Sequence, residues 1–318
     1  MVQPDLTIAV PTLKRAAYLQ EAVDSALKQQ DCRIEVLISQ DLLPDGTLDP
    51  ATESWSARCA VDHECVRYLA AAQRLGLAGN WNRVTEAARG EFLTIIGDDD
   101  RLLPAFASTL LAHRDRAEVV FGNHHVIDAR GERLAAATVE ATRRFYRDGL
   151  QQGEQVPAAA CVWRNAVPMS ASIIHTATAR RHRFADHLNT PDIEFFARVA
   201  AAGARFYFCH DYLAEYRVHP LSATVGGLTM AALVTALEPI AVPHELEPVK
   251  ASLLAGFGDA MLWDGIRSRE PAALRRACAT PHTRSRLARA IKIAARTPVV
   301  GTALIASLAR AYRATRPT

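Results

Sequence analysis

The sequence predicts an α/β protein in which helices flank a mostly parallel central sheet. Short apolar, β-branched runs alternate along the chain with segments whose apolar residues recur at helical spacing, and this alternation is typical of β–α–β units with right-handed crossovers. One of the apolar runs, residues 92–96, ends abruptly in a glycine and three consecutive carboxylates. Because ligands of open α/β sheets bind beyond the carboxyl ends of the strands, the sequence also predicts where a site lies.

Composition narrows the class of protein. The chain has 318 residues, 49% of them hydrophobic and 22% charged, so it is long enough for one large α/β domain with an appendage. The net charge of +3 is too small to predict a nucleic-acid partner. The first residues lack the pattern of a signal peptide, and no window reaches the roughly 20 apolar residues that a spanning helix needs. We therefore expect a cytoplasmic protein.

The six cysteines are scattered and show no disulfide pattern. Cys59, His63 and Cys65 lie close enough in sequence to suggest zinc, but no CxxC pair is present and no second ligand pair follows. The pattern favours reduced thiols with a structural role.

The first part of the chain predicts strand–helix steps. Residues 6–10 form an apolar run closed by a proline, which predicts the first strand, and residues 16–30 carry apolar side chains at helical spacing. Residues 34–39 and 65–69 predict the next two strands, with a polar, helix-like stretch between them. A glycine-containing segment then leads to an expected helix over residues 80–88, for which Asn80 is a suitable N-cap.

The later elements are patterned less regularly. Residues 92–96 predict the fourth strand, and residues 129–165 are polar and poorly patterned, so we expect a mobile loop over a site there. The remaining expected elements are strands at residues 118–121, 171–174 and 206–208, helices over residues 104–113 and 192–203, and helical structure from residue 229 onward.

Three consecutive carboxylates, Asp98, Asp99 and Asp100, follow the fourth expected strand. Neighbouring negative charges repel one another, so a cluster at this position makes sense if a cation lies there. Carboxylate oxygens suit Mg²⁺ or Mn²⁺, and Mg²⁺ is commonly held by one or two carboxylates together with substrate phosphates. The alternative is that the three are solvated loop residues that cap the next helix.

Four segments, in order and at matching distances, resemble the inverting GT-A glycosyltransferases of family 2. They are Pro11-Thr12 with the helix that follows, Gln40-Asp41 with Asp45-Gly46-Thr47, residues 76–82 with the three aspartates, and residues 192–198 with residues 216–219. The resemblance covers residues 6–224. It implies a GT-A domain, which is a Rossmann-like nucleotide-diphospho-sugar transferase fold, over residues 1–225, and it leaves residues 226–318 as a helical C-terminal region.

The resemblance implies an enzyme that moves a sugar from a nucleotide-diphosphate donor, of the UDP or dTDP type, to a hydroxyl of a glycan or lipid-linked acceptor in polysaccharide or glycoconjugate biosynthesis. Transfer would proceed with inversion and depend on Mg²⁺ or Mn²⁺. Asp99 matches the main metal ligand, and Asp100 and His219 are the further expected ligands. The family signature is Asp-x-Asp, and the run from Gly97 to Asp100 departs from it at the first acidic position.

The resemblance also implies a donor-nucleotide site at the strand ends. The matching residues are Pro11, Thr12, Asp41, Arg74, Asn80, Asp98 and Arg217. Asp41 would accept a hydrogen bond from the base, Asp98 would lie near the donor ribose or sugar, and Arg217 would supply positive charge for the diphosphate. Gln40 stands where the family usually has another acid. From the residues alone, Asp41 is equally well explained as a turn residue, and Arg74 as a solvent-facing side chain.

An inverting transfer needs one base to take a proton from the acceptor hydroxyl. Asp192, at the start of an expected helix, matches the base of the family, and Glu194 is the second candidate. A helix N-terminus stabilises a carboxylate as the anion, so Asp192 needs burial or nearby carboxylates to raise its pKa. Considered alone, Asp192 is also explained as an ordinary N-cap.

Two other functions stay open from the sequence. A nucleotidyltransferase that makes a sugar nucleotide would share the sheet and the acidic site, but it should carry a glycine-rich phosphate loop, and residues 11–15 contain no glycine. A catalytically silent nucleotide-sugar-binding module is supported only by the altered metal motif. The basic amphipathic segment over residues 282–318 fits either peripheral contact with the inner face of a membrane or plain packing, and a homodimer is also compatible with the sequence.

Overall fold

The computed structural model describes residues 3–219, 230–268, 277, 282–283 and 289. The chain divides into two compact units, Met1–Leu228 and Thr229–Thr318, and the candidate site belongs to the first. The domain boundary expected at residues 225–226 lies outside the described residues, as does most of the basic segment over residues 282–318.

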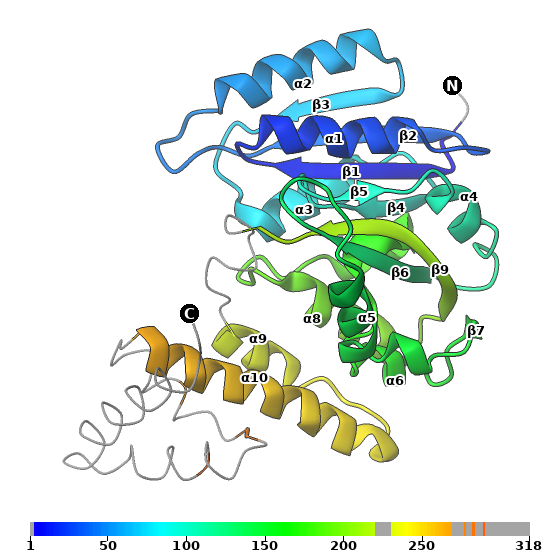
Figure 1. Cartoon of the computed structure of the whole chain (residues 1–318), viewed down its shortest axis with the longest axis vertical. Coiled ribbons are helices and arrows are strands. Elements are labelled where there is room, and N and C mark those ends of the chain that lie inside the picture. The colour runs from blue at the N-terminus through cyan, green and yellow to red at the C-terminus, as the bar shows by residue number, and fades with distance from the viewer. Residues whose placement is uncertain (1–2, 220–229, 269–276, 278–281, 284–288, 290–318) are drawn as a thin grey trace. The chain divides into compact units, whose positions relative to one another are not determined.

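The described residues of the first unit form one nine-stranded sheet (Figure 1). Its order is β3-β2-β1-β4-β8-β6-β9-β5, and β7 pairs with β9. The strands β1 to β4 pair in parallel, as do β6 and β9, whereas the short strands β5, β7 and β8 pair antiparallel. The strands are β1 (Leu6–Thr12), β2 (Ile34–Gln40), β3 (Val66–Ala70), β4 (Phe92–Ile95), β5 (Arg101–Leu102), β6 (Val119–Ile127), β7 (Gly153–Glu154), β8 (Ser172–His175) and β9 (Phe206–Arg217).

Helices cover the sheet, which confirms the predicted α/β fold. In Figure 1, α1 runs alongside β1 and β2, and its apolar stripe of Leu19, Val23 and Ala26 packs in one core cluster with the fully buried Ile8 and Val10 of β1. The helices of this unit are α1 (Ala16–Leu27), α2 (Pro50–Asp62), α3 (Gly76–Ala87), α4 (Phe106–Leu111), α5 (Ala135–Arg144), α6 (Ala158–Val162), α7 (Thr176–His182) and α8 (Pro191–Ala201), with the 3-10 turns η1 (Arg147–Gly149) and η2 (Met169–Ala171).

The described part of the second unit is helical, as the sequence predicts. It contains α9 (Met230–Leu237), the 3-10 turn η3 (His244–Leu246) and α10 (Glu247–Ser268). The Lys250 ammonium group donates hydrogen bonds to the carbonyls of Glu238 and Ile240, at 2.7 and 2.6 Å, and so satisfies backbone oxygens that follow α9. Among the helices that the structure describes, none combines the length and the apolar character needed to cross a membrane.

Two local predictions are wrong. Residues 129–165 do not form one long loop, because they contain α5, η1, β7 and α6. The buried face of α5 consists of Thr138 and Thr142, so no apolar period marks this helix in the sequence. Asn80 is not an N-cap, because α3 begins at Gly76. Its side chain instead donates to the Ser39 carbonyl at 2.9 Å and accepts from the Ser39 hydroxyl at 2.6 Å, tying α3 to β2.

Both β6 and β9 extend beyond their predicted ends. β6 continues through Asn123, His124 and His125, which were expected to follow it, and β9 continues to Arg217. The two strands pair with each other along this length, with a register irregularity around Asn123. Pairing between segments so far apart in sequence leaves no local signal. It has a functional consequence, because the extension delivers Arg217 to the aspartates that follow β4.

Candidate functional site

The site is built around the aspartate loop, residues 97–100, at the carboxyl end of β4. The three aspartates are buried, and a hydrogen bond of 3.1 Å from the Asp100 amide to the Gly97 carbonyl closes the turn. A Cβ at Gly97 would lie 2.6 Å from Oδ1 of Asp99, so the loop needs glycine at this position for the carboxylates to fold inward. The alternative that these acids are solvated does not fit their burial.

Thr12, the last residue of β1, and Arg15, three residues later, contact the loop directly. The Thr12 hydroxyl donates to Oδ2 of Asp98 at 2.6 Å. The Arg15 guanidinium lies across two carboxylates, with Nη2 2.5 Å from Oδ1 of Asp98 and Nη1 2.5 Å from Oδ2 of Asp99. Arg15 was not among the site residues expected from the sequence. Its only sequence signal is its position, just past the end of a strand whose carboxyl end faces the site.

Positive charge is scarce in the aspartate loop. Burial raises the pKa of Asp98 to about 6, although the nearby Arg15 acts in the opposite direction. Burial, together with the negative charge of Asp99, also raises the pKa of Asp100 above its ordinary value. These are the shifts expected where carboxylates outnumber the cations that contact them. The loop is therefore a place where a further cation would be stabilised.

The donor set at the loop fits Mg²⁺ or Mn²⁺. Nε2 of His219 lies 2.9 Å from Oδ2 of Asp99, so an imidazole nitrogen and a carboxylate oxygen, both able to bind a metal, lie next to each other. Within the part of the chain that the structure describes, no three His, Cys, Asp or Glu side chains converge on a point. A two-residue donor set is compatible with an ion that takes its other ligands from phosphate oxygens and water.

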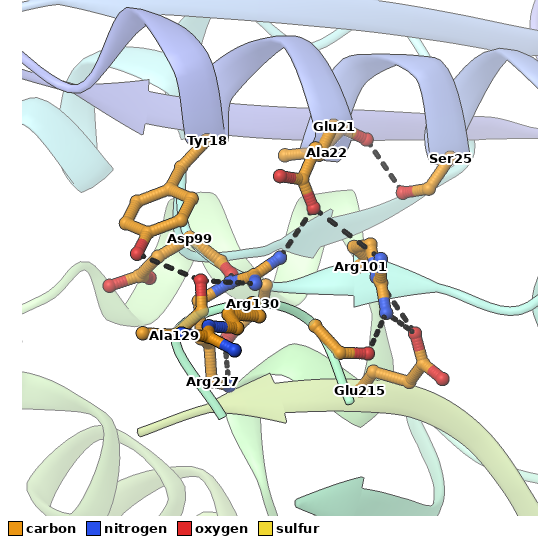
Figure 2. A network of polar contacts seen from close by, with 12 residues as sticks. Tyr18, Glu21, Ala22, Ser25, Asp99, Arg101, Ala129, Arg130, Glu215 and Arg217 are labelled. Carbon is orange, nitrogen blue, oxygen red and sulfur yellow. Dashed lines mark hydrogen bonds and ion pairs between the residues drawn. The ribbon is translucent and has the colours of Figure 1, made fainter. Parts of the chain in front are cut away.

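Arg217 anchors the aspartate loop rather than facing outward (Figure 2). Its Nε donates to the Asp99 carbonyl at 2.7 Å, and its backbone N–H donates to Oδ1 of Asp100 at 2.9 Å. Its Nη2 donates to Glu21 on α1 at 2.6 Å, and its guanidinium stacks 4.6 Å from the centre of the Tyr18 ring. The side chain is 0% exposed. Its partners are thus groups of this chain, which differs from the diphosphate contact implied by the resemblance.

A second set of ion pairs extends this anchoring network. Arg101 on β5 donates to Glu215 on β9 at 2.8 Å and to Glu21 at 3.4 Å, and Arg133 donates to Glu215 at 2.7 Å (Figure 2 shows the Arg101 pairs). The network joins α1 to β5 and β9 around the aspartate loop. The sequence does not predict this network, because its members come from four separate stretches of the chain.

Replacement of Arg217 by methionine is expected to lower the free energy of unfolding by about 2–4 kcal/mol, because it leaves the buried Asp99 carbonyl without the Arg217 donor and removes the shorter of the two ion pairs of Glu21. Urea denaturation measures this loss. Glu21→Gln is the matched control, since it removes one exposed charge of the same network, and it should lower stability by no more than about 1 kcal/mol. Equal losses in the two variants would contradict the anchoring role of Arg217.

Asp41 connects the end of β2 to the start of α3. Its Oδ1 accepts from the amides of Leu42 and Leu75, and its Oδ2 accepts from the amide of Gly76, each at 2.8 Å. Gly76 has a φ of +71°, a conformation that glycine adopts without strain. The Asp41 carboxylate therefore stabilises the backbone turns after β2 and before α3, as its residue type suggests. It also lies at the carboxyl end of β2, where the contact with the donor base is expected.

Arg74 is exposed and faces a cavity of about 410 Å³ next to the start of α3. Four other charged residues line this cavity, namely the basic Arg83 and Arg183 and the acidic Glu86 and Asp186. Pro11, the other expected donor-site residue, lies on β1 just before Thr12. The strand ends thus gather Thr12, Asp41 and the aspartate loop along one edge of the sheet.

Asp192 and Glu194 form a separate group in the first turn of α8. In the described part of the chain, no hydrogen bond or ion pair joins either residue to the aspartate loop. Glu194 is buried and forms an ion pair with Arg198 one turn later, so its carboxylate already has a partner. Asp192 keeps partial solvent access, yet the protein around it raises the pKa of its carboxyl. Of the two, Asp192 has the properties expected of a base.

The fold and the site define a class of protein, an open α/β sheet with a buried acidic loop at the carboxyl ends of its strands, which is where open α/β sheets bind their ligands. More specifically, the chain belongs to the family described as Glycosyl transferase family 2, whose model matches residues 7–167, about half of the chain. The family resemblance inferred from the sequence is thereby confirmed.

One curated relative is the GalNAc(5)-diNAcBac-PP-undecaprenol beta-1,3-glucosyltransferase of Campylobacter jejuni. It is 33% identical over 122 residues, which are 38% of this chain and 38% of that protein. The match therefore spans well under half the length of this relative.

Two solved structures share the fold. S. aureus TarS 1-349 in complex with UDP-GlcNAc matches with a TM-score of 0.68 at 15% identity, over 98% of this chain and 92% of that one. The mannosyltransferase PcManGT from Pyrobaculum calidifontis, in complex with GDP-Man and Mn²⁺, matches with a TM-score of 0.61 at 17% identity, over 98% and 81%.

Proposed function

We propose that this protein transfers one sugar from a nucleoside-diphosphate donor to a hydroxyl of a glycan or lipid-linked acceptor, with inversion and with Mg²⁺ or Mn²⁺ bound. The observation that carries the proposal is the buried aspartate loop at the end of β4, where the guanidinium of Arg15 pairs with two of three carboxylates. A divalent cation held there would neutralise the charge that develops on a diphosphate leaving group.

Each residue of the site has a role in this reaction. Asp99 and His219 hold the cation, with Asp100 next to them, and Asp98 with Thr12 faces the donor ribose. Asp41 lies at the neighbouring strand end, where it accepts a hydrogen bond from the donor base. Asp192 takes the proton from the acceptor hydroxyl, and the raised pKa of its carboxyl makes it a better base than an ordinary aspartate.

The related proteins support the proposed substrates. TarS was crystallised with UDP-GlcNAc, and PcManGT with GDP-Man and Mn²⁺, so this fold accommodates nucleoside-diphosphate sugars and a divalent metal. The Campylobacter jejuni relative is named for an undecaprenol-diphosphate-linked acceptor, which supports a lipid-linked acceptor here. From the sequence resemblance we propose a UDP- or dTDP-type donor.

The proposal is tested by a calorimetric binding panel of UDP, dTDP, GDP and CMP, each with Mn²⁺ and with EDTA. One nucleoside diphosphate should bind tightly with Mn²⁺ and at least about tenfold more weakly with EDTA, because an ion held by Asp99 would supply positive charge to its phosphates. CMP, with a single phosphate, serves as the control and should bind weakly in both conditions. Failure of every diphosphate to bind with Mn²⁺ present would overturn the proposal and favour a silent module.

A further inference from the structure

We propose that Arg15 is an exchangeable internal cation of the aspartate loop. In the metal-free protein its guanidinium neutralises Asp98 and Asp99, and it moves to the phosphates of the donor when a divalent ion takes its place. Arg15 would then couple metal binding to donor binding. This inference rests on the proposed function, since it assumes that the loop holds a metal and a diphosphate.

The geometry places Arg15 in direct competition with a metal. Oδ2 of Asp99 is approached by Nη1 of Arg15 at 2.5 Å and by Nε2 of His219 at 2.9 Å. The same Nη1 lies 3.4 Å from Nε2 of His219. A cation bound by Asp99 and His219 needs the lone pairs that face this guanidinium. Arg15 and the metal therefore cannot both keep these contacts.

Arg15 is free to leave, which Arg217 is not. The contacts of the Arg15 side chain are Asp98, Asp99 and His219, and the side chain is 25% exposed. Its backbone is fixed, because its carbonyl accepts the first hydrogen bond of α1, from the Leu19 amide at 2.9 Å. Only the side chain has to swing. Arg217, by contrast, is 0% exposed and bound by several groups of the chain.

The exchange has a thermodynamic consequence. Mn²⁺ alone must displace Arg15 from Asp99 and leave its guanidinium with Asp98 as its one carboxylate partner, so Mn²⁺ alone binds weakly. A nucleoside diphosphate supplies a new partner for Arg15 as well as ligands for the metal, so each raises the affinity of the other. Linkage requires that the two effects be equal in size. The share of this coupling free energy that depends on the Arg15 side chain should be lost when Arg15 is replaced.

The test compares Arg15→Gln with the wild-type full-length protein. Mn²⁺ binding is followed by the loss of the free Mn²⁺ electron paramagnetic resonance signal, with and without UDP or GDP, and diphosphate binding in EDTA is followed by calorimetry. We expect Arg15→Gln to bind Mn²⁺ alone about three- to tenfold more tightly, to bind the diphosphate in EDTA severalfold more weakly, and to show a smaller coupling between the two ligands.

Lys14→Gln is the matched control. Lys14 is exposed, neighbours Arg15 in the chain and pairs with none of the aspartates, so this variant loses the same charge without losing the contact. It should behave like the wild type. Arg15→Lys keeps a cation at the loop and should restore most of the wild-type coupling, which also covers the case in which Arg15→Gln is poorly folded.

The outcomes separate the two proposals. If the wild type shows metal–diphosphate coupling and Arg15→Gln shows the same Mn²⁺ affinity and the same coupling, the exchange by Arg15 is wrong while the proposed function stands. If the wild type binds Mn²⁺ neither alone nor with UDP or GDP, the proposed metal-dependent function is wrong, and the role of Arg15 falls with it.

Discussion

Asp99→Asn is expected to abolish metal-dependent nucleotide binding while leaving the fold intact. Both His219 and Arg15 contact Oδ2 of Asp99, so this oxygen is the centre of the proposed cation site. Loss of an outer partner of a metal ligand already weakens metal binding by about 10- to 100-fold, and loss of a ligand should exceed about 100-fold. Calorimetry with Mn²⁺ and the nucleoside diphosphate selected by the panel measures the effect.

The integrity of the fold is part of this prediction. Asparagine conserves the volume of Asp99, and the Asp99 carbonyl that Arg217 holds is unchanged. The melting temperature in EDTA should therefore stay close to that of the wild type. Asp24→Asn, which neutralises an exposed acid on α1, is the control for the general loss of negative charge. Metal-dependent binding of ordinary strength in Asp99→Asn would exclude Asp99 as the ligand.

The sequence predicts well those elements whose energetics are local. β1, β2 and β4 are buried along nearly their whole length, so they show as mainly apolar runs, and α1 has one apolar stripe that packs with them. The position of the aspartate loop follows from the same pattern, because it comes directly after β4. These features need only a few neighbouring residues to be recognised.

The parts that the sequence does not predict depend on distant pairing. Arg15 meets Asp99 across 84 positions of the chain, and Arg217 meets Glu21 across 196 positions. No periodic pattern within a short stretch of sequence predicts such contacts. Likewise β8 is inserted antiparallel between β4 and β6, although its sequence, Ser172–His175, reads like any short strand.

Polar contacts also replaced expected apolar ones. α5 buries threonine hydroxyls, with Thr138 donating to the Leu134 carbonyl at 3.0 Å and Thr142 to the Thr138 carbonyl at 2.9 Å, so a polar sequence forms an ordered helix. Asn80 satisfies Ser39 rather than a helix end. In both cases the role of the residue depends on the group to which it is hydrogen-bonded, and the residue type alone does not predict that group.

Asp192→Asn is expected to stop sugar transfer while leaving donor binding near that of the wild type. An asparagine cannot accept the acceptor proton, and loss of a general base typically lowers kcat by about 10²- to 10⁴-fold. No hydrogen bond or ion pair of the described residues connects Asp192 to the aspartate loop, so the diphosphate affinity with Mn²⁺ should not follow kcat. Transfer is measured as nucleoside diphosphate released in the presence of an acceptor.

Glu194→Gln discriminates between the two candidates for the base, because both changes replace one carboxylate by an amide in the same turn of α8. Glu194 is ion-paired with Arg198, so its change should act mainly on stability and leave most of kcat. A larger loss of kcat in Glu194→Gln than in Asp192→Asn would reverse the assignment.

The pH profile of sugar transfer gives a second criterion for the base. A base must be deprotonated, and burial raises the pKa of Asp192, so activity should fall with decreasing pH earlier than an ordinary aspartate would allow, and Asp192→Asn should lose that limb.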